Sequence, residues 1–473
     1  MGKTSRSDTS EPRDPPPERG WDTGHPNPLD VVVLLSIAVF MVVSPPDLQY
    51  LEYRYAPGSP LSGETLRGAS VGLSTLLLVT YFLAAIGGRG RWAARLKLGI
   101  VLALGVICVL LPTASDMLAR HEVGLHVNGR TVSFAHDGGV LQTEAAIGFL
   151  LRGQSPYSAD YSGSVMALGT DSRQGLWQSL GFEGNPAYHF YPYPPFTVLL
   201  SLPFCLVSHA TLGWFDQRMV YFVAWAVLAV LGHRLPASPH WRLPLMVLLV
   251  LNPISAMFFV LGTNDILCVT FLVATVFLLA RKRCRGSSLL LGLSCGVKQF
   301  AWILVPFYLA YLYTRLSDEH DESKRKQLWR LSWPLFVSAG VILLPFLVWD
   351  PKGLFDSLIV GQGVVYPFRH NSLGFSNFLI LFNVIESYRD QFPLLAFHVF
   401  IVLPVGVYGL RRVLKQQTVS SMAAWYAVTL LLLLFFGRNF AHSYLTVVFS
   451  MMAVSWALAR DEPQQAARMG PPQ

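Results

Sequence analysis

Most residues that could do chemistry lie in one polar stretch, roughly Ser115 to Tyr191, between runs apolar enough to cross a bilayer. Its middle reads HDGGVLQTE, with Asp137 followed by two glycines. Two glycines leave little side-chain crowding and a freely bending backbone, so this carboxylate can face a bound substrate at close range. Asp-Gly is also a turn signal, and an aspartate can stand there only to bond its own backbone. The sequence leaves both interpretations open.

The same stretch holds other polar candidates. Glu144 precedes an apolar helical pattern, Ala145 to Leu151, and can cap that helix, whereas Asp160 follows Tyr157 in an expected turn. The stretch ends in YPYPPF, from Tyr191 to Phe196. Prolines are tolerated in the first turn of a helix and tyrosines favour the membrane interface, so this motif predicts a helix start at the membrane surface.

A lysine interrupts a later apolar region. Residues 287–297 would span about 17 Å as a helix, which is too short for a ~30 Å hydrocarbon core. We therefore expect a hairpin of two short helices, continuing from Phe300 to Leu312, with Lys298 at its tip and deep in the protein. A lysine at membrane depth costs a few kcal/mol unless it is paired or wet, so Lys298 is a candidate for binding an anion. A structural salt bridge to a nearby aspartate is the alternative.

Further polar groups flank other apolar runs. Asp265 follows Gly-Thr-Asn at the start of a long run, where Thr263 or Asn264 could cap the helix and its dipole would favour the aspartate. Arg438 and His442 stand on a short turn between two runs and could be interface anchors. A functional role is favoured because the predicted topology places Asp137, Lys298, Arg369 and His442 on the same side of the membrane.

Composition bounds the class of protein. Of 473 residues, 52% are hydrophobic and only 14% charged, and the mean hydropathy is +0.43, which is typical of a polytopic membrane protein. The net charge of +8 comes from basic clusters between apolar runs, the positive-inside pattern, so we expect no nucleic-acid partner. The five cysteines lie in or near apolar runs and predict neither disulfides nor a zinc site.

The order of apolar and basic segments predicts an all-α polytopic membrane protein with about 11–13 transmembrane helices and cytoplasmic termini. One segment within 192–261 must fail to cross, because otherwise the basic cluster at Arg281 would lie outside; we suspect a broken or re-entrant element near Pro192 or Pro253. The expected segments are a disordered cytoplasmic tail (1–28), three transmembrane helices (29–114), an external catalytic loop with short amphipathic helices (115–191), a transmembrane module (192–349), a second external segment with the C-terminal transmembrane helices (350–459) and a cytoplasmic tail (460–473).

The motifs together resemble the GT-C membrane glycosyltransferases, and most of all the polyprenyl-phosphate-mannose-dependent mannosyltransferases. The resemblance covers about residues 110–459 and rests on HDGG with Glu144, GQSPY, YPYPPF, GTND, GVKQ and the Arg438 to His442 turn. It implies a GT-C-like fold, a lipid-phosphate sugar donor, an external active site in a bacterial-type plasma membrane, inversion at the sugar, and a first-loop aspartate as base, by position Asp137. Three spans precede the loop where the superfamily usually has one, and Asn264 stands where the mannosyltransferases usually have glutamine.

The chemistry fits these residues. Polyprenyl phosphate is a good leaving group, so the enzyme needs one base on the acceptor hydroxyl and cations near the phosphate. We expect a hexose, first of all mannose, to pass to a lipid, glycan or protein acceptor, with membrane lipid around the enzyme and no metal or cofactor. The rival function is a membrane transporter or lipid flippase, which would want charges along a path through the membrane and repeat symmetry. The candidate residues are Asp137 as base; Lys298, Arg438 and Arg369 for the donor phosphate; and Glu144, Tyr157, Asp160, Tyr191, Tyr193, Asp265, Gln299, His370 and His442 for substrate.

Overall fold

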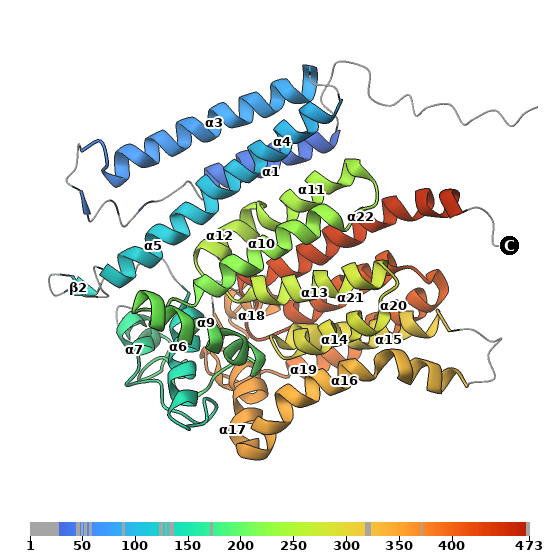
Figure 1. Cartoon of the computed structure of the whole chain (residues 1–473). Helices are drawn as coiled ribbons and strands as arrows, with labels where there is room; N and C mark the ends of the chain where they lie inside the picture. Colours follow the sequence, from blue (N-terminus) through green and yellow to red (C-terminus); the bar gives the residue numbers. More distant parts are fainter. Residues whose placement is uncertain are drawn as a thin grey trace, which may run out of the picture.

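The structure is a computed structural model of the chain, and it is built almost entirely from helices (Figure 1). Its only described strands are the two-residue pair β1 (His126–Val127) and β2 (Arg130–Thr131). The all-α class is therefore confirmed. The structure describes residues 28–43, 48, 51, 54–55, 59–87, 90–122, 126–127, 130–131, 137–170, 174–316, 323–369 and 372–469.

The first helices form a layer along one side of the molecule (Figure 1). They are α1 (Pro28–Val43), α3 (Gly63–Gly87), and a continuous helix made of α4 (Gly90–Gly105), η1 (Val106–Leu110) and α5 (Leu111–Glu122). The continuous helix has 33 residues, about 50 Å at 1.5 Å per residue, well beyond a ~30 Å hydrocarbon core. Its end, past the expected boundary at Ala114, thus carries charged residues to the elements of the loop.

The loop elements gather at one end of the molecule, which we call the loop end (Figure 1). They include α6 (Gly138–Leu151), α7 (Val165–Thr170), α8 (Gln174–Ser179) and η3 (Pro186–His189). Helix α6 begins seven residues before the expected Ala145, so Glu144 lies in its middle and the expectation that Glu144 caps this helix is wrong. The second polar segment adds α17 (Pro351–Phe355), η5 (Asp356–Val365) and α18 (Phe375–Leu381) at the same end.

Between these segments, most helices run back and forth between the loop end and the opposite end (Figure 1). Helices α14 and α16 approach closely because Gly292 faces Ser338, and small residues at such a crossing let two backbones come near. The hairpin around Lys298 is present as expected. The helices are α10 (Arg218–Arg234), α11 (Pro239–Val250), α12 (Pro253–Val260), α13 (Asp265–Ala280), α14 (Cys284–Cys295), η4 (Gln299–Ile303), α15 (Leu304–Tyr313), α16 (Lys324–Trp349), α19 (Leu394–Phe397), η6 (His398–Val402), α20 (Leu403–Gln416), α21 (Val419–Phe435), η7 (His442–Tyr444) and α22 (Leu445–Met469).

Several helices are suited to a bilayer. Among the described residues, five helices are long and apolar enough to cross it, or six if the bent pair α11–α12 is one span. The expected number of about 11–13 also counted shorter apolar runs, which form helices of 10–17 residues. Many large apolar side chains on the outer faces are exposed, such as Leu76 on α3 and Val341 on α16. Exposed apolar faces of this kind suit lipid, and the chain is a multi-pass membrane protein.

Helix α9 (Phe196–Leu212) is the segment within 192–261 that does not run from one end of the molecule to the other. The chain begins α9 where the Phe196 amide donates to the Gly296 carbonyl (2.9 Å), beside the Lys298 hairpin tip. It leaves α9 at Gly213 and starts α10 at Arg218, which contacts residues of α5. Both ends of α9 therefore lie at the loop end, where the helix packs against α6 (Figure 1). The apolar segment 196–212 stays at the loop end, and the suspected break near Pro253 appears as a 44° bend.

This placement predicts a labelling pattern. In a cysteine-free background, Ala210→Cys and Ser162→Cys, both at exposed positions, should react with a membrane-impermeant thiol reagent from the same side of the membrane. Lys415→Cys, exposed at the end of α20, should react only from the other side. If α9 crossed the bilayer, Ala210→Cys would be labelled from the same side as Lys415→Cys, and the placement of α9 at the loop end would be wrong.

Candidate active site

Asp137 stands at the start of α6 and is half-buried. Its Oδ2 accepts a hydrogen bond from the Gly139 amide (2.9 Å), and its own amide donates to the Leu261 carbonyl (2.5 Å), just before α13. The expectation that Asp137 bonds its own backbone is confirmed. The same bonds fix the carboxylate in one place, at a junction of the loop with the transmembrane helices, which is also what a positioned base needs.

Tyr193 meets Asp137 at Gly139. A Cβ built on Gly139 would lie 2.5 Å from the Tyr193 hydroxyl and 2.7 Å from the Asp137 Oδ2, so both groups press against the same bare Cα. Any side chain at position 139 would push one of them away. Burial raises the pKa of Tyr193 well above its ordinary value, and the negative charge of Asp137 adds to this effect. The hydroxyl of Tyr193 therefore stays protonated beside the carboxylate.

A cavity of about 640 Å³ opens next to Tyr193. Its polar part holds Lys298, Gln299, Arg438 and Tyr444. Gln391, His398 and Asn439 also line it. Much of the remaining wall is apolar, with large side chains from η4, η5, α19 and α21: Trp302, Ile303, Leu358, Leu394, Leu395 and Leu433. One cavity therefore combines two cationic side chains with an extended apolar surface.

Lys298 is buried, with 5% of its surface exposed, and it is paired. Its ammonium donates to Asp265 Oδ1 (2.6 Å) and Asn264 Oδ1 (3.1 Å), and lies 4.8 Å from the centre of the Tyr444 ring. The expected salt bridge to a nearby aspartate is thus confirmed. Asn264 does not cap α13 with its side chain, because its oxygen faces the lysine instead. Pairing lowers the cost of burying the charge, yet Lys298 still lines the cavity.

Arg438 is the other buried cation of the cavity, with 5% exposed, so it is not the interface anchor that the sequence left open. Its guanidinium donates to the backbone carbonyls of Tyr366 and Tyr388 and lies 4.0 Å from the centre of the Phe368 ring. Within the described part of the chain, no carboxylate lies within ion-pair distance of it. Burial lowers the pKa of Arg438 to about 10, and the more distant Asp390 opposes the shift, so the group is still charged at neutral pH.

Tyr444 connects these parts. Its ring centre lies 4.8 Å from the Lys298 ammonium, and the charges of Asp265, Asp137 and Arg369 surround it. Arg369 lies over the rings of Trp177 (5.4 Å) and Tyr366 (5.5 Å) and is half-buried. The structure therefore brings the expected base and the expected phosphate-binding residues to one region, around a tyrosine that the sequence did not single out.

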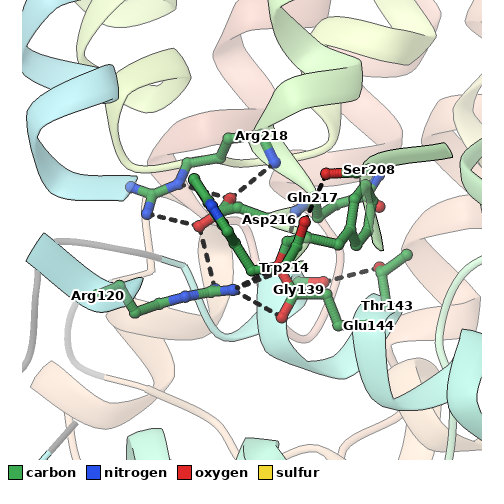
Figure 2. A network of polar contacts seen from close by, with 10 residues as sticks. Arg120, Gly139, Thr143, Glu144, Ser208, Trp214, Asp216, Gln217 and Arg218 are labelled. Atoms are coloured by element: carbon green, nitrogen blue, oxygen red, sulfur yellow. Dashed lines mark hydrogen bonds and ion pairs between the residues drawn. The ribbon is translucent and has the colours of Figure 1, made fainter. Parts of the chain in front are cut away.

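Behind α6, a buried charge network joins three helices (Figure 2). Arg120 of α5 donates to both carboxylate oxygens of Glu144 (2.8 Å each) and lies 3.3 Å from Asp216. Asp216 accepts from Arg218 at the start of α10 (3.0 Å), and neither of these two side chains is exposed. Glu144 also accepts from the Gln217 amide (2.8 Å). The network fixes the loop helix α6 to the starts of the helices around it.

The charges of this network depend on one another. Burial works against the charged form of Asp216, but the guanidinium groups of Arg218 and Arg120 outweigh it and hold its pKa below the usual range. Burial raises the pKa of Glu144, although Arg120 opposes the shift. The aliphatic part of the Arg218 side chain also packs against Gly262. Gly262 follows Leu261, and the Leu261 carbonyl accepts the hydrogen bond from the Asp137 amide. The network therefore holds the two segments between which Asp137 lies: α6, through Glu144, and the chain at Leu261 and Gly262, through Arg218.

The amino-acid pattern of the region around this cavity decides the family. Residues 191–437, more than half of the 473, match the model of glycosyltransferase family 87. The chain belongs to glycosyltransferase family 87. Among curated proteins, none matches the chain. The matched range includes Tyr193 and Lys298 and ends one residue before Arg438, whereas Asp137 lies before it.

In this family 87 glycosyltransferase, three of the expected substrate-binding residues hold the chain segment that carries Tyr193. The Tyr157 hydroxyl donates to the Tyr193 carbonyl (3.0 Å), and Gln299 donates to the carbonyls of Pro192 (2.9 Å) and Leu358 (3.2 Å). Tyr191 is fully buried, with its hydroxyl 3.2 Å from that of Thr143. These side chains hold the segment between η3 and α9 and so fix where the tyrosine points.

Other expected residues of the family 87 enzyme lie apart from the cavity. Asp160 is exposed and accepts from the amide (2.9 Å) and hydroxyl (2.8 Å) of Ser162, which confirms the expected turn. It lines a different cavity, with Glu144 and Arg120. His442 is exposed at the start of η7, two residues before Tyr444. His370 falls outside the described residues.

Sequence reasoning missed Tyr444, Arg120, Asp216 and Arg218 in the family 87 enzyme. One signal was available, because the sequence Asp-Gln-Arg at 216–218 stands directly before a long apolar run. Charges at such a place are costly unless they are paired, which indicates a network. No comparable signal marks Tyr444, because tyrosines at the start of a membrane helix are common interface residues.

Proposed function

We propose that this family 87 glycosyltransferase transfers a hexose, first of all mannose, from a polyprenyl-phosphate donor to a hydroxyl of a lipid, glycan or protein acceptor, with inversion. The observation that carries the proposal is the cavity beside Tyr193, which combines Lys298 and Arg438 with a long apolar wall. A lipid-linked sugar phosphate has the same two parts, an anion and a hydrocarbon chain. Asp137 lies next to Tyr193, which lines this cavity.

Arg438 suits the donor phosphate best. Its guanidinium is buried and held by backbone carbonyls and a ring, so binding an anion would supply the opposite charge that its surroundings lack. Lys298 is already neutralised by Asp265, and its contribution is smaller. Charge that develops on the phosphate as the sugar leaves is stabilised by such fixed cations, and the apolar wall takes the first isoprene units.

The reaction then needs few parts. Asp137 takes the proton of the acceptor hydroxyl while its oxygen attacks the anomeric carbon. The bond from that carbon to the phosphate oxygen breaks, and polyprenyl phosphate leaves with the electron pair. Tyr193 keeps its proton and can donate a hydrogen bond to the sugar or to the carboxylate. Attack from the side opposite the leaving phosphate inverts the configuration at the sugar.

We place the active site on the external face of the membrane and both termini in the cytoplasm. Basic clusters lie at the end opposite the loop end: they precede α4 and α14 and begin α16, and another closes α20. Lysine and arginine are enriched in cytoplasmic loops. The loop end, with Asp137, then faces outward.

The proposal is tested with purified full-length protein in detergent and a membrane lipid extract as acceptor source. Release of the leaving group is measured in parallel: polyprenyl phosphate from polyprenyl-phosphate mannose or polyprenyl-phosphate glucose, and GDP from GDP-mannose. Turnover with a polyprenyl-phosphate sugar, and none with the nucleotide sugar, supports the proposal. Turnover with GDP-mannose alone would show that the donor is not lipid-linked.

The two cations give a second prediction. Lys298→Ala would leave Asp265 buried without its partner and so confuse folding with binding. The double variant Lys298→Gln with Asp265→Asn removes both charges of the pair and should fold. Arg438→Gln removes a cation that has no carboxylate partner among the described residues, so it leaves no buried carboxylate unpaired. A charge-assisted contact contributes about 1.5–3 kcal/mol, so Arg438→Gln should raise the donor KM or lower kcat/KM by roughly 10- to 100-fold. The double variant should lose less.

The control is Arg389→Gln, an exposed arginine at the loop end that lies outside the cavity. It should keep wild-type kinetics. Wild-type kinetics in a well-folded Arg438→Gln protein would remove this arginine from the donor site, and a larger loss in the double variant would make Lys298 the main phosphate ligand.

A further inference from the structure

A second charged cavity, of about 490 Å³, lies far from the candidate active site, at the opposite end of the molecule. It lies between the first helices, α1, α3 and α4, and the transmembrane core at α10 and α11. Its polar lining is mostly basic: Asp30, Arg95, Lys97, His233, His240 and Arg242. The proposed transfer reaction uses none of these residues.

The single carboxylate of this basic cavity is already satisfied. Asp30 accepts from the Lys97 ammonium at 2.9 and 3.0 Å and from the Tyr81 hydroxyl at 2.9 Å. Two arginines remain, and no carboxylate lies within ion-pair distance of either in the described part of the chain. Within the described residues, Arg242 donates over long distances, to the carbonyls of Pro236 (3.5 Å) and Ala237 (3.3 Å). Among the described residues, the basic cavity therefore has more positive than negative charge.

A histidine of the basic cavity also lacks a hydrogen-bond partner among the described residues. The Nδ1 atom of His233 is buried and has no hydrogen-bond partner within the described residues. His233 lies in the last turn of α10 and lines the basic cavity beside Arg242. A buried polar atom is costly when it is left unbonded, so a ligand that reaches it would recover that cost.

The surroundings identify the kind of anion. The same helices expose large apolar side chains that suit lipid, among them Leu35 of α1 and Leu83 of α3. Trp92, 72% exposed at the start of α4, suits the level of the headgroups. Basic pockets between transmembrane helices on the cytoplasmic side bind anionic headgroups. An anionic phospholipid bound here would place its phosphate between the arginines of the basic cavity and its acyl chains along α1 and α3.

We propose that the basic cavity binds the phosphate headgroup of an anionic phospholipid, which joins the first helices to the transmembrane core. Helices α1, α3 and α4 precede the part of the chain that matches family 87, and α1 packs on α11 and α12. The lipid phosphate contacts Arg95 from one side and Arg242 and His233 from the other. Its binding stabilises the docking of these helices and does not depend on which sugar the enzyme transfers.

The test measures thermal unfolding of the delipidated full-length protein in neutral detergent with phosphatidylglycerol, phosphatidylcholine or inorganic phosphate. We expect phosphatidylglycerol to raise Tm by on the order of 5 °C, because a ligand that binds only the folded state stabilises it. Phosphatidylcholine and phosphate should have no such effect. An equal shift with inorganic phosphate would show a free-phosphate site, and an equal shift with phosphatidylcholine would show unspecific lipid binding; either result overturns the proposal.

Variants locate the effect. Arg95→Gln with Arg242→Gln should abolish the shift and remove the phosphatidylglycerol that native mass spectrometry finds bound. Arg411→Gln with Lys415→Gln removes the same charge from α20, outside the basic cavity, and should keep both. If the first double variant does not fold, Arg95→Gln alone, at an exposed side chain, should still reduce the shift. A shift that is retained in these variants would place the lipid elsewhere.

Discussion

Asp137→Asn is expected to lower kcat by at least ~10²–10⁴-fold, because an amide of nearly the same shape cannot take the acceptor proton. Turnover is measured with purified protein and a polyprenyl-phosphate sugar, and donor binding is measured separately. Donor affinity should change little, because the expected phosphate ligands are other side chains, Lys298 and Arg438, which line the cavity.

Folding should survive this change for a structural reason. Asp137 caps α6 by accepting from the Gly139 amide, and asparagine is an equally good N-cap whose side-chain oxygen can accept the same bond. The bond from the Asp137 amide to the Leu261 carbonyl does not involve the side chain. A loss of activity in Asp137→Asn can therefore be separated from a loss of structure by its unfolding temperature.

The matched control is Asp160→Asn, the same chemical change in an exposed turn of the same loop. It should keep near wild-type turnover. Retained turnover in Asp137→Asn with its loss in Asp160→Asn would move the base to Asp160, and equal tolerance at both positions would remove the catalytic interpretation of this loop. Glu144→Gln is a poor control, because Glu144 belongs to the buried network.

Asp216→Asn is expected to destabilise the folded protein by about 3–5 kcal/mol, because it removes the carboxylate that Arg120 and Arg218 share in a buried charge network. Arg218 has no exposed surface, and its distance to a second carboxylate, that of Asp116, is 4.0 Å, against 3.0 Å to Asp216. The measurement is thermal or denaturant unfolding in detergent. Activity should fall as well, since the network supports α6 and the residue after Leu261.

The control for this second variant is again Asp160→Asn, which removes an exposed carboxylate and should change stability by little. A partner test is Asp216→Leu with Arg218→Met, which removes both charges of the pair. That double variant should recover part of the lost stability, because a buried pair can be replaced by apolar side chains of similar volume at little cost. If Asp216→Asn unfolds like the wild type, the network does not hold the loop.

Local patterns in the sequence determined the class of the protein and several helix boundaries. Hydropathy needs no knowledge of neighbours far along the chain, so the multi-pass class, the helix start at Phe196 and the hairpin at Lys298 followed from the residues themselves. The start of α6 did not follow. Two glycines disfavour a helix, yet α6 begins at Gly138, because Asp137 caps it and the Leu261 carbonyl holds the chain there.

Only the tertiary structure decided which apolar segment stays at the loop end and which charges pair. Helix α9 is apolar, and its packing against α6 and its bonds to the Lys298 hairpin keep it at the loop end. Lys298 meets Asp265 across 33 residues of sequence, and the partners Arg120 and Asp216 lie farther apart still. A charge at membrane depth must find a partner, but its spacing in the sequence does not name that partner. The path of the helices through space decides it, because an ion pair forms only between groups that the packing brings within about 4 Å.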